Sequence, residues 1–143
     1  MNERILHKNL AAGRWYELSL AEQMDNIGSE VGRAAKTQNK DEARFWNAVV
    51  RAQELFFLTL ADKHWGERRK EIARAYEVFC DAVLGGKVYG SDLESLDRYF
   101  IYFALSAMRQ RQIALASFDI NAKTCLSSDT FCTLWSHSFM ELT

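Results

Sequence analysis

Hydrophobic residues recur every three or four positions through most of the chain between residues 19 and 118. This spacing matches the turn of an α-helix and differs from the alternation of a half-buried strand. The sequence also contains no proline, the residue that most strongly interrupts a helix. The pattern therefore predicts an all-α domain.

Capping residues and polar breaks divide this pattern into helices. Ser19 and Glu22 have the spacing of a capping box, in which each side chain bonds the backbone N–H of the other residue, so the first helix starts there and runs to about residue 37. Asp41 is the predicted N-cap of the second helix, which runs to about residue 62.

The remaining two helices follow the same logic. The third spans about residues 67–84, where Gly85 and Gly86 stop it. The fourth begins at Ser91, which has capping-box spacing to Glu94, and continues to about residue 116. Long helices joined by short turns predict an up-and-down four-helix bundle.

We therefore expect a helical-bundle domain at residues 1–118 and a C-terminal tail or appended helix at residues 119–143. An extra short helix over residues 2–12 is compatible with this pattern. The tail is rich in Ser and Thr and only weakly periodic, so its pattern alone assigns it no fixed structure.

Two glycines one turn apart interrupt the first predicted helix. Gly28 and Gly32 each cost roughly 1 kcal/mol relative to Ala in a helix interior, so a contact that needs a bare backbone must compensate. They predict a groove that a bulky neighbouring helix occupies. The alternative is that the groove admits a ligand or nucleic acid, beside the polar residues that follow it. These residues are Asn26, Ser29, Glu30 and Arg33.

The second helix has a wide apolar arc, which predicts a central position. Trp46, Val50 and Phe57 widen its apolar stripe to roughly 160°. Gln53 falls inside this arc, and we expect its amide to be buried and hydrogen-bonded to a neighbouring helix.

The fourth helix carries more apolar surface than one bundle position needs. Tyr99, Tyr102 and Leu105 point away from the stripe that packs on the other helices. They predict contact with the tail, a second subunit or another protein. We expect a homo-oligomer or a protein partner.

The distribution of charge gives a weaker indication of function than the apolar pattern does. The chain has 18 Lys and Arg against 19 Asp and Glu, so no overall positive charge favours nucleic acid. A local candidate for nucleic-acid contact opens the third helix and consists of Arg68, Arg69, Lys70 and Arg74. Interleaved glutamates make a solvated face the simpler interpretation. Further basic residues lie near the turn that joins the first two predicted helices: Arg33, Lys36, Lys40, Arg44 and Arg51.

Motifs that would define an enzyme are missing. A di-iron bundle needs Glu-x-x-His pairs, and none of the three histidines has a glutamate three residues before it. HEPN-like ribonucleases have an arginine followed by histidine four to six residues later, and no arginine here has that spacing. We therefore assign no catalytic residue.

The three cysteines, Cys80, Cys125 and Cys132, lack the close pairing of a disulfide framework or zinc knuckle. Pairing of Cys80 or Cys132 with a histidine as a nucleophilic dyad is a weaker alternative, as is a metal held by Cys125, Cys132 and His137. We expect no metal and no cofactor. The longest apolar runs are far short of a membrane span of about 20 residues, so we expect a cytoplasmic protein without membrane association.

Three segments carry a resemblance to known proteins: RWYELSLAEQMDNIGSEVGRA, RAQELFFLTLAD and EVFCDAVLGGKVYGS. They resemble a family of small, uncharacterised conserved bacterial proteins, from about Trp15 to Arg111, which implies a helical bundle and no assigned chemistry. The segment AAKTQNKDEARFWNAVVRAQEL and a long third helix are similar to the four-helix-bundle proteins of rRNA intervening sequences and of diversity-generating retroelements. Those proteins bind nucleic acid or a reverse transcriptase through basic surfaces, and the acidic balance here departs from that pattern.

The sequence thus predicts a non-enzymatic helical-bundle interaction or accessory protein. The alternative is a nucleic-acid-associated bundle, such as a degenerate HEPN-like toxin–antitoxin component.

Overall fold

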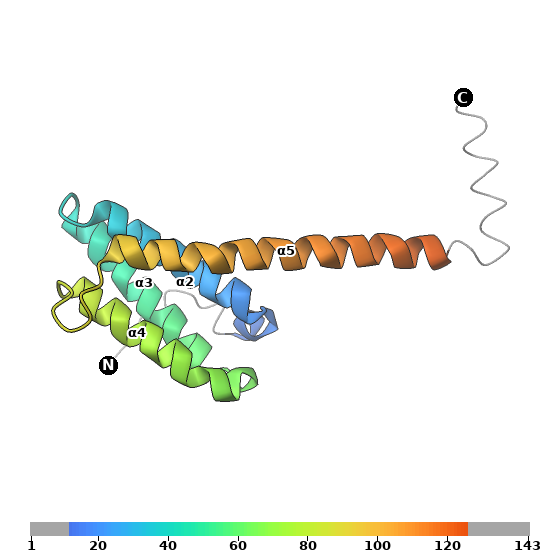
Figure 1. The fold of residues 1–143 in the computed structure, drawn as a ribbon, viewed down its shortest axis with the longest axis horizontal. Coiled ribbons are helices and arrows are strands. Elements are labelled where there is room, and N and C mark those ends of the chain that lie inside the picture. The colour runs from blue at the N-terminus through green and yellow to red at the C-terminus, as the bar shows by residue number, and fades with distance from the viewer. Residues whose placement is uncertain (1–11, 126–143) are drawn as a thin grey trace, which may run out of the picture. The chain divides into compact units, whose positions relative to one another are not determined.

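A computed structural model describes residues 12–125, with side chains described to residue 120. Every element in that range is helical, which confirms the all-α prediction (Figure 1). The predicted helix at 2–12, the tail after residue 125 and the candidate ligands Cys132 and His137 lie outside the described structure. The elements are the 3-10 helices η1 (Arg14–Glu17) and η2 (Lys63–Arg68) and the α-helices α2 (Leu20–Thr37), α3 (Glu42–Ala61), α4 (Arg69–Val83) and α5 (Leu93–Cys125).

The first two predicted helix starts are confirmed. Ser19 and Glu22 form the capping box: the Ser19 hydroxyl accepts the Glu22 N–H at 3.3 Å, and the Glu22 carboxylate accepts the Ser19 N–H at 3.0 Å. Asp41 precedes α3, and its carboxylate accepts the Arg44 N–H at 3.1 Å. Both caps satisfy backbone donors that a helix start leaves free.

The predicted N-cap of α5 is wrong by one residue. Asp92, not Ser91, accepts the Ser95 N–H, at 2.8 Å, so the helix begins at Leu93. Aspartate and serine cap equally well, and the preceding loop decides between them. A side chain at Gly86, whose φ is +70°, would meet the Ser91 carbonyl oxygen at 2.5 Å, so Ser91 is held against this turn.

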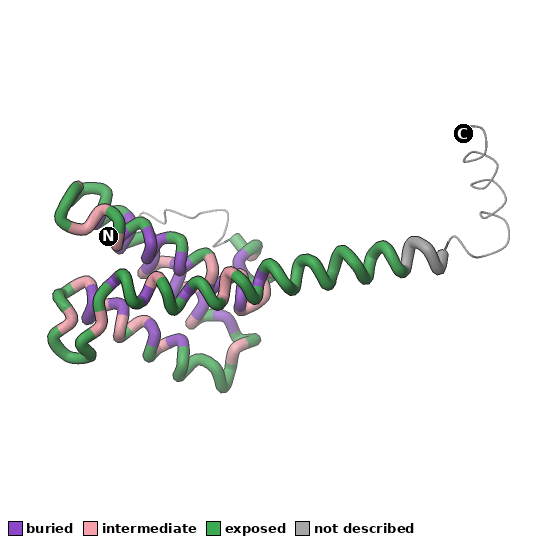
Figure 2. Tube along the Cα trace, turned by 45° about the horizontal axis from the view of Figure 1, so that its top comes forward, coloured by how far each residue is buried: buried purple, intermediate pink, exposed green. Residues whose placement is uncertain are grey.

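Successive helices reverse direction from α2 to α3 to α4, and the start of α5 follows the end of α4, as an up-and-down order requires (Figure 1). Buried residues lie on the faces that these helices turn toward one another (Figure 2). Phe56 of α3 is fully buried, with ring centroids 5.6 Å from Phe79 of α4 and 6.3 Å from Phe100 of α5. These aromatic contacts join three helices in one core.

The glycine groove contains α5. A Cβ at Gly28 would lie 2.5 Å from the Cβ of Phe100, and a Cβ at Gly32 would lie 2.6 Å from Oδ1 of Asp97. Both distances are shorter than van der Waals contact, so α5 approaches α2 as closely as it does only because these positions lack side chains. The helix-packing interpretation of the two glycines is confirmed.

The arc on α3 is buried over only part of its width. Phe45, Val49 and Phe56 are in the core, whereas the widening residues stay exposed. Gln53 is half-buried, and its side chain is hydrogen-bonded to Tyr76 of α4, as expected. The apolar arc is therefore only partly covered, although α3 contacts α2, α4 and, through Phe56, α5. The exposed apolar residues of α3 are Trp46 (46%), Val50 (48%) and Phe57 (56%).

The chain divides into two compact units, Met1–Ala107 and Met108–Thr143. The boundary falls inside α5, which continues to Cys125, so the predicted helix end near residue 116 is wrong. The tail that the sequence places after residue 118 begins within this helix. In the second unit, the helix exposes large apolar side chains, among them Leu115 (68%) and Phe118 (72%).

Candidate functional site: two pockets and a buried polar cluster

A basic pocket of about 470 Å³ lies between the second half of α2 and the first half of α3. Four cationic side chains line it together with a single carboxylate. Residues three or four apart share one helix face, which is why both helices present several lining side chains to the same space. The lining residues are Glu30, Arg33, Lys36 and Thr37 of α2 and Arg44, Asn47, Ala48 and Arg51 of α3.

Glu30 is the buried carboxylate of this basic pocket, with 7% of its surface exposed. Its Oε1 accepts a hydrogen bond from Nη1 of Arg33 at 2.6 Å. Its Oε2 is buried and has no hydrogen-bond partner among the described residues. A buried acceptor without a partner costs roughly 1 to 3 kcal/mol, so the fold keeps this carboxylate at the expense of stability.

The cations around Glu30 differ in how they are paired. Arg44 contacts Asp41 at 3.2 Å, in an exposed ion pair. Lys36 and Arg51 are exposed and have no ion-pair partner within residues 12–120. The pocket therefore has an excess of positive charge on a chain whose net charge is -1.

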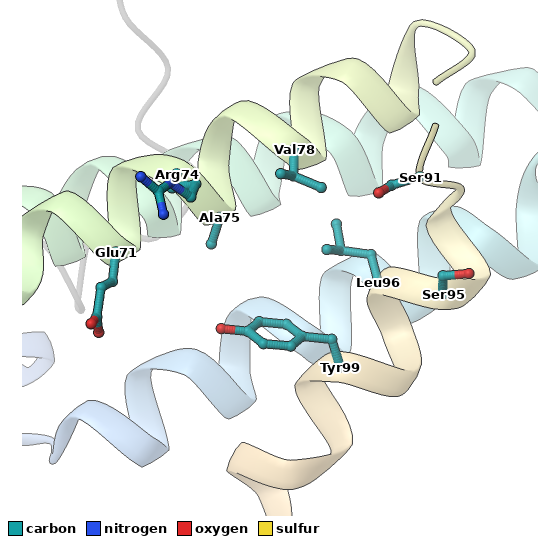
Figure 3. Close-up of a pocket in the computed structure, with 8 residues that line it drawn as sticks. All are labelled: Glu71, Arg74, Ala75, Val78, Ser91, Ser95, Leu96 and Tyr99. Carbon is teal, nitrogen blue, oxygen red and sulfur yellow. The ribbon is translucent and has the colours of Figure 1, made fainter. Parts of the chain in front are cut away.

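An apolar pocket of about 450 Å³ lies between α4 and the first turns of α5 (Figure 3). Tyr99 of α5 and Glu71 of α4 both point into this space (Figure 3). Partial burial, and secondarily the Glu71 carboxylate, raise the pKa of Tyr99, so its phenol is neutral at physiological pH. The remaining lining residues are Arg74, Ala75, Val78, Ser91, Ser95 and Leu96.

The structure separates the predicted nucleic-acid contact from both pockets. Arg68, Arg69 and Lys70 are exposed at the junction of η2 and α4 and line neither pocket. Arg74 alone reaches the apolar pocket, where it joins Tyr99 from the predicted interface.

The other site residues predicted from the sequence lie in different parts of the structure. Asn26 donates to the Glu22 carbonyl at 2.8 Å and is exposed, as is Ser29. Glu30 and Arg33, predicted beside the glycine groove, lie in the basic pocket instead. The predicted interface residues are all exposed: Tyr99 (46%), Tyr102 (74%) and Leu105 (55%).

A buried polar cluster at the start of α2 was missed by the sequence analysis. Gln23 is fully buried: its Nε2 donates to the Trp15 carbonyl at 2.9 Å and to Oδ2 of Asp62 at 3.0 Å, and its Oε1 accepts from Nε1 of Trp65 at 2.9 Å. The available signal was its position four residues before the buried Ile27, which places both on one face of α2.

Asp62 completes this cluster. Its Oδ1 accepts the His64 backbone N–H at 3.0 Å and lies 2.7 Å from Nδ1 of the imidazole. Burial raises the pKa of this carboxyl, but the hydrogen bonds from Gln23 and His64 outweigh burial and hold the pKa below its ordinary value. Because both carboxylate oxygens are engaged, Asp62 joins α2 to η2, while Gln23 joins the same cluster to Trp15 of η1, and Asp62 is a structural residue.

Three wider observations complete the description. Within residues 12–120, no group of three or more His, Cys, Asp or Glu is arranged to hold a metal ion. None of the described helices combines the length and apolar character that a membrane crossing requires. Comparisons with models of protein families, with curated proteins and with solved structures give no match.

Proposed function

We propose that the protein is a non-enzymatic helical-bundle interaction protein that docks the outer surface of α5 on a partner, with a second copy of the chain as the expected partner. The observation that carries the proposal is the apolar outer face of α5 within the first unit. Ile101 (49%), Tyr102 (74%) and Leu105 (55%) are exposed there. At 100° per residue these three side chains span about one-third of the helix circumference.

Apolar side chains of this size gain from burial. Removing each from water contributes roughly 1.5 to 3 kcal/mol, and contiguous exposed apolar surface marks interaction sites more often than bare solvent contact. A twofold interface uses each residue twice, so partial burial is enough to support a dimer.

The apolar pocket strengthens this choice of surface. It opens between α4 and α5 beside Tyr99, so a partner side chain has a cavity of about 450 Å³ to enter. Interface anchors are commonly aromatic or aliphatic side chains in such pockets. The α3 residues Trp46 and Phe57 offer a further apolar contact surface.

The test is the oligomeric state of the full chain by analytical ultracentrifugation. We expect the unmodified protein at twice the mass of one chain, and Tyr102→Glu as a folded monomer, because a buried unpaired carboxylate opposes association. The control is Leu84→Glu, which changes the charge equally at an exposed residue outside this face; Leu84 and Tyr102 are both 74% exposed. A monomer at every accessible concentration would reject self-association, and capture of the unmodified protein but not Tyr102→Glu by a different protein would place that protein on the surface instead.

A further inference from the structure

We propose that the basic pocket between α2 and α3 binds the phosphodiester backbone of a nucleic-acid strand. This inference concerns a different surface from the proposed protein interface. The pocket's shape, charge and lining each support the same ligand class.

The charged side chains that line the basic pocket are predominantly cationic. Three guanidinium groups and one ammonium group surround the pocket, while its one carboxylate already contacts Arg33 at 2.6 Å. Lys36 and Arg51 have no anionic partner in the described part of the chain. Cations gathered in a concave space raise the local potential more than the same charges spread over a flat surface. An anionic ligand is therefore favoured.

The spacing of the cations favours several anionic groups over one. Arg44 and Arg51 are seven residues apart on α3, a rise of about 10 Å along the helix axis. Arg33 and Lys36 are three residues apart on α2, which adds about 4.5 Å of rise on the other wall. A separation of about 10 Å along α3 is larger than one phosphate group, so Arg44 and Arg51 are placed to contact different phosphates of one strand.

The lining also excludes the apolar contacts that a protein or a free nucleotide would use. Ala48 is the only apolar residue that lines the pocket. Protein interfaces depend on buried aromatic or aliphatic anchors, and nucleobases bind by stacking on aromatic side chains. Thr37 and Asn47 instead offer hydrogen bonds to sugar or phosphate oxygens. The contacts are those of sequence-independent backbone binding.

Glu30 has a positioning role in this arrangement. Its Oε1 holds the Arg33 guanidinium, whose side chain is otherwise 60% exposed. An unrestrained arginine would lose more rotamer entropy on binding a phosphate. The contact with Glu30 therefore restrains a guanidinium group that lines the pocket.

The experiment measures fluorescence anisotropy of labelled 15-nucleotide oligo(U) and oligo(dT) with the full-length protein, at salt concentrations from about 50 to 200 mM. The test variant is Lys36→Gln/Arg51→Gln. The matched control is Arg69→Gln/Lys70→Gln, which removes the same charge from exposed residues outside the pocket.

We expect the test variant to bind at least about tenfold more weakly, and its salt dependence, the slope of log affinity against log salt, to decrease in magnitude by about 1.4 for two lost phosphate contacts. The control should bind within about twofold of the unmodified protein. Thermal unfolding of both variants checks the fold, which we expect to be unchanged because all four residues are exposed. Binding of oligo(U) alone would identify RNA as the ligand, and binding of both strands would identify the shared backbone.

Three results would overturn the proposal. They are no binding of either strand at about 50 mM salt, equal losses in the test variant and the control, and competition by poly-glutamate as strong as competition by an unlabelled strand. The last result would assign the pocket to acidic proteins. Tyr102→Glu should leave strand binding unchanged, so this proposal and the α5 interface fail independently.

Discussion

Gln23 and Glu30 lie seven residues apart on α2, and both are buried polar side chains on the same side of the helix. The Gln23 amide has a partner for its oxygen and two for its nitrogen, at 2.9 to 3.0 Å. The Glu30 carboxylate has one partner, Arg33, and one oxygen with none in the described structure.

The difference separates a structural polar cluster from a binding site. Around Gln23, three chain segments meet and every described contact is internal, so the buried amide already has its partners within the chain. Around Glu30, the surrounding cations are exposed and outnumber the carboxylate. Burial of a polar group alone therefore does not identify a site; the unmatched charge around Glu30 does.

The largest expected effect on stability comes from removing the Gln23 amide. Gln23→Met keeps nearly the same side-chain length and leaves Oδ2 of Asp62, Nε1 of Trp65 and the Trp15 carbonyl without this partner. Unpaired buried groups of this kind cost about 1 to 3 kcal/mol each, partly relieved by relaxation, so we expect a loss of about 3 kcal/mol in the free energy of unfolding. Urea denaturation measures it, and a loss below about 1 kcal/mol would show that the cluster is not tightly coupled.

The part of α2 between Gln23 and Glu30 provides the next test. Gly28→Ala places a methyl group 2.5 Å from the Cβ of Phe100, an atom that cannot move without shifting α5. We expect a loss of about 2 kcal/mol by overpacking, measured by thermal or urea unfolding.

Gly32→Ala is the matched control for this pair. Its methyl group meets Oδ1 of Asp97, the end of a side chain that can rotate away, and alanine gains roughly 1 kcal/mol of helix propensity. We expect little change in stability. Equal losses at the two glycines would contradict the different contacts described for them.

Acid should weaken the Gln23 cluster through Asp62. The folded-state pKa of Asp62 lies below its ordinary value of 3.8, so its contribution to stability is fully present above that value and is lost as the pH falls through the lowered folded-state pKa. We expect a fall in the free energy of unfolding over this acid range that is smaller than the effect of Gln23→Met. Asp62→Asn should lose this component of the pH profile, and an unchanged profile would show that another carboxyl causes it.

The smallest effect is expected at Glu30. Glu30→Met removes a buried carboxylate with an unpartnered oxygen and leaves Arg33, which is 60% exposed, free to be solvated. Replacing a buried charge by an apolar side chain of similar size is often neutral or stabilising. We expect no loss of stability, and a gain of up to about 1 kcal/mol, by the same urea assay, in contrast to Gln23→Met. A loss like that of Gln23→Met would make Glu30 a structural residue and remove the distinction.

The fold was predictable where local chemistry decides it. The Ser19–Glu22 capping box and the Asp41 cap depend only on residues three positions apart, and both form. The glycine groove was predictable because two costly residues one turn apart require a compensating contact. The α5 cap was not, because Ser91 and Asp92 are adjacent candidates of residue types that cap equally well.

The candidate site was less predictable because it needs two helices. Glu30 and Arg33 were recognised beside the groove, but their association with Arg51 depends on how α2 and α3 are rotated against each other. The burial of two amides was not predictable from one helix either: Gln53, inside a wide apolar arc, is half-buried, whereas Gln23 is fully buried. Apolar arc width does not show which part of the arc a neighbour covers.

The approach of Phe100 to Gly28 also bears on how the chain is synthesised. α2 leaves the ribosome before its partner in α5 does. Until α5 packs against it, Gly28 and Gly32 lower the stability of the helical state of α2 relative to its unfolded state. At about 5 to 20 residues per second, the polypeptide between the two helices takes several seconds to make. During this interval the nascent α2 and α3 would have to keep their apolar faces soluble without α5. Docking of α5 is thus expected to be a late step of co-translational folding, and a stalled chain that ends before Phe100 would be a client for chaperones.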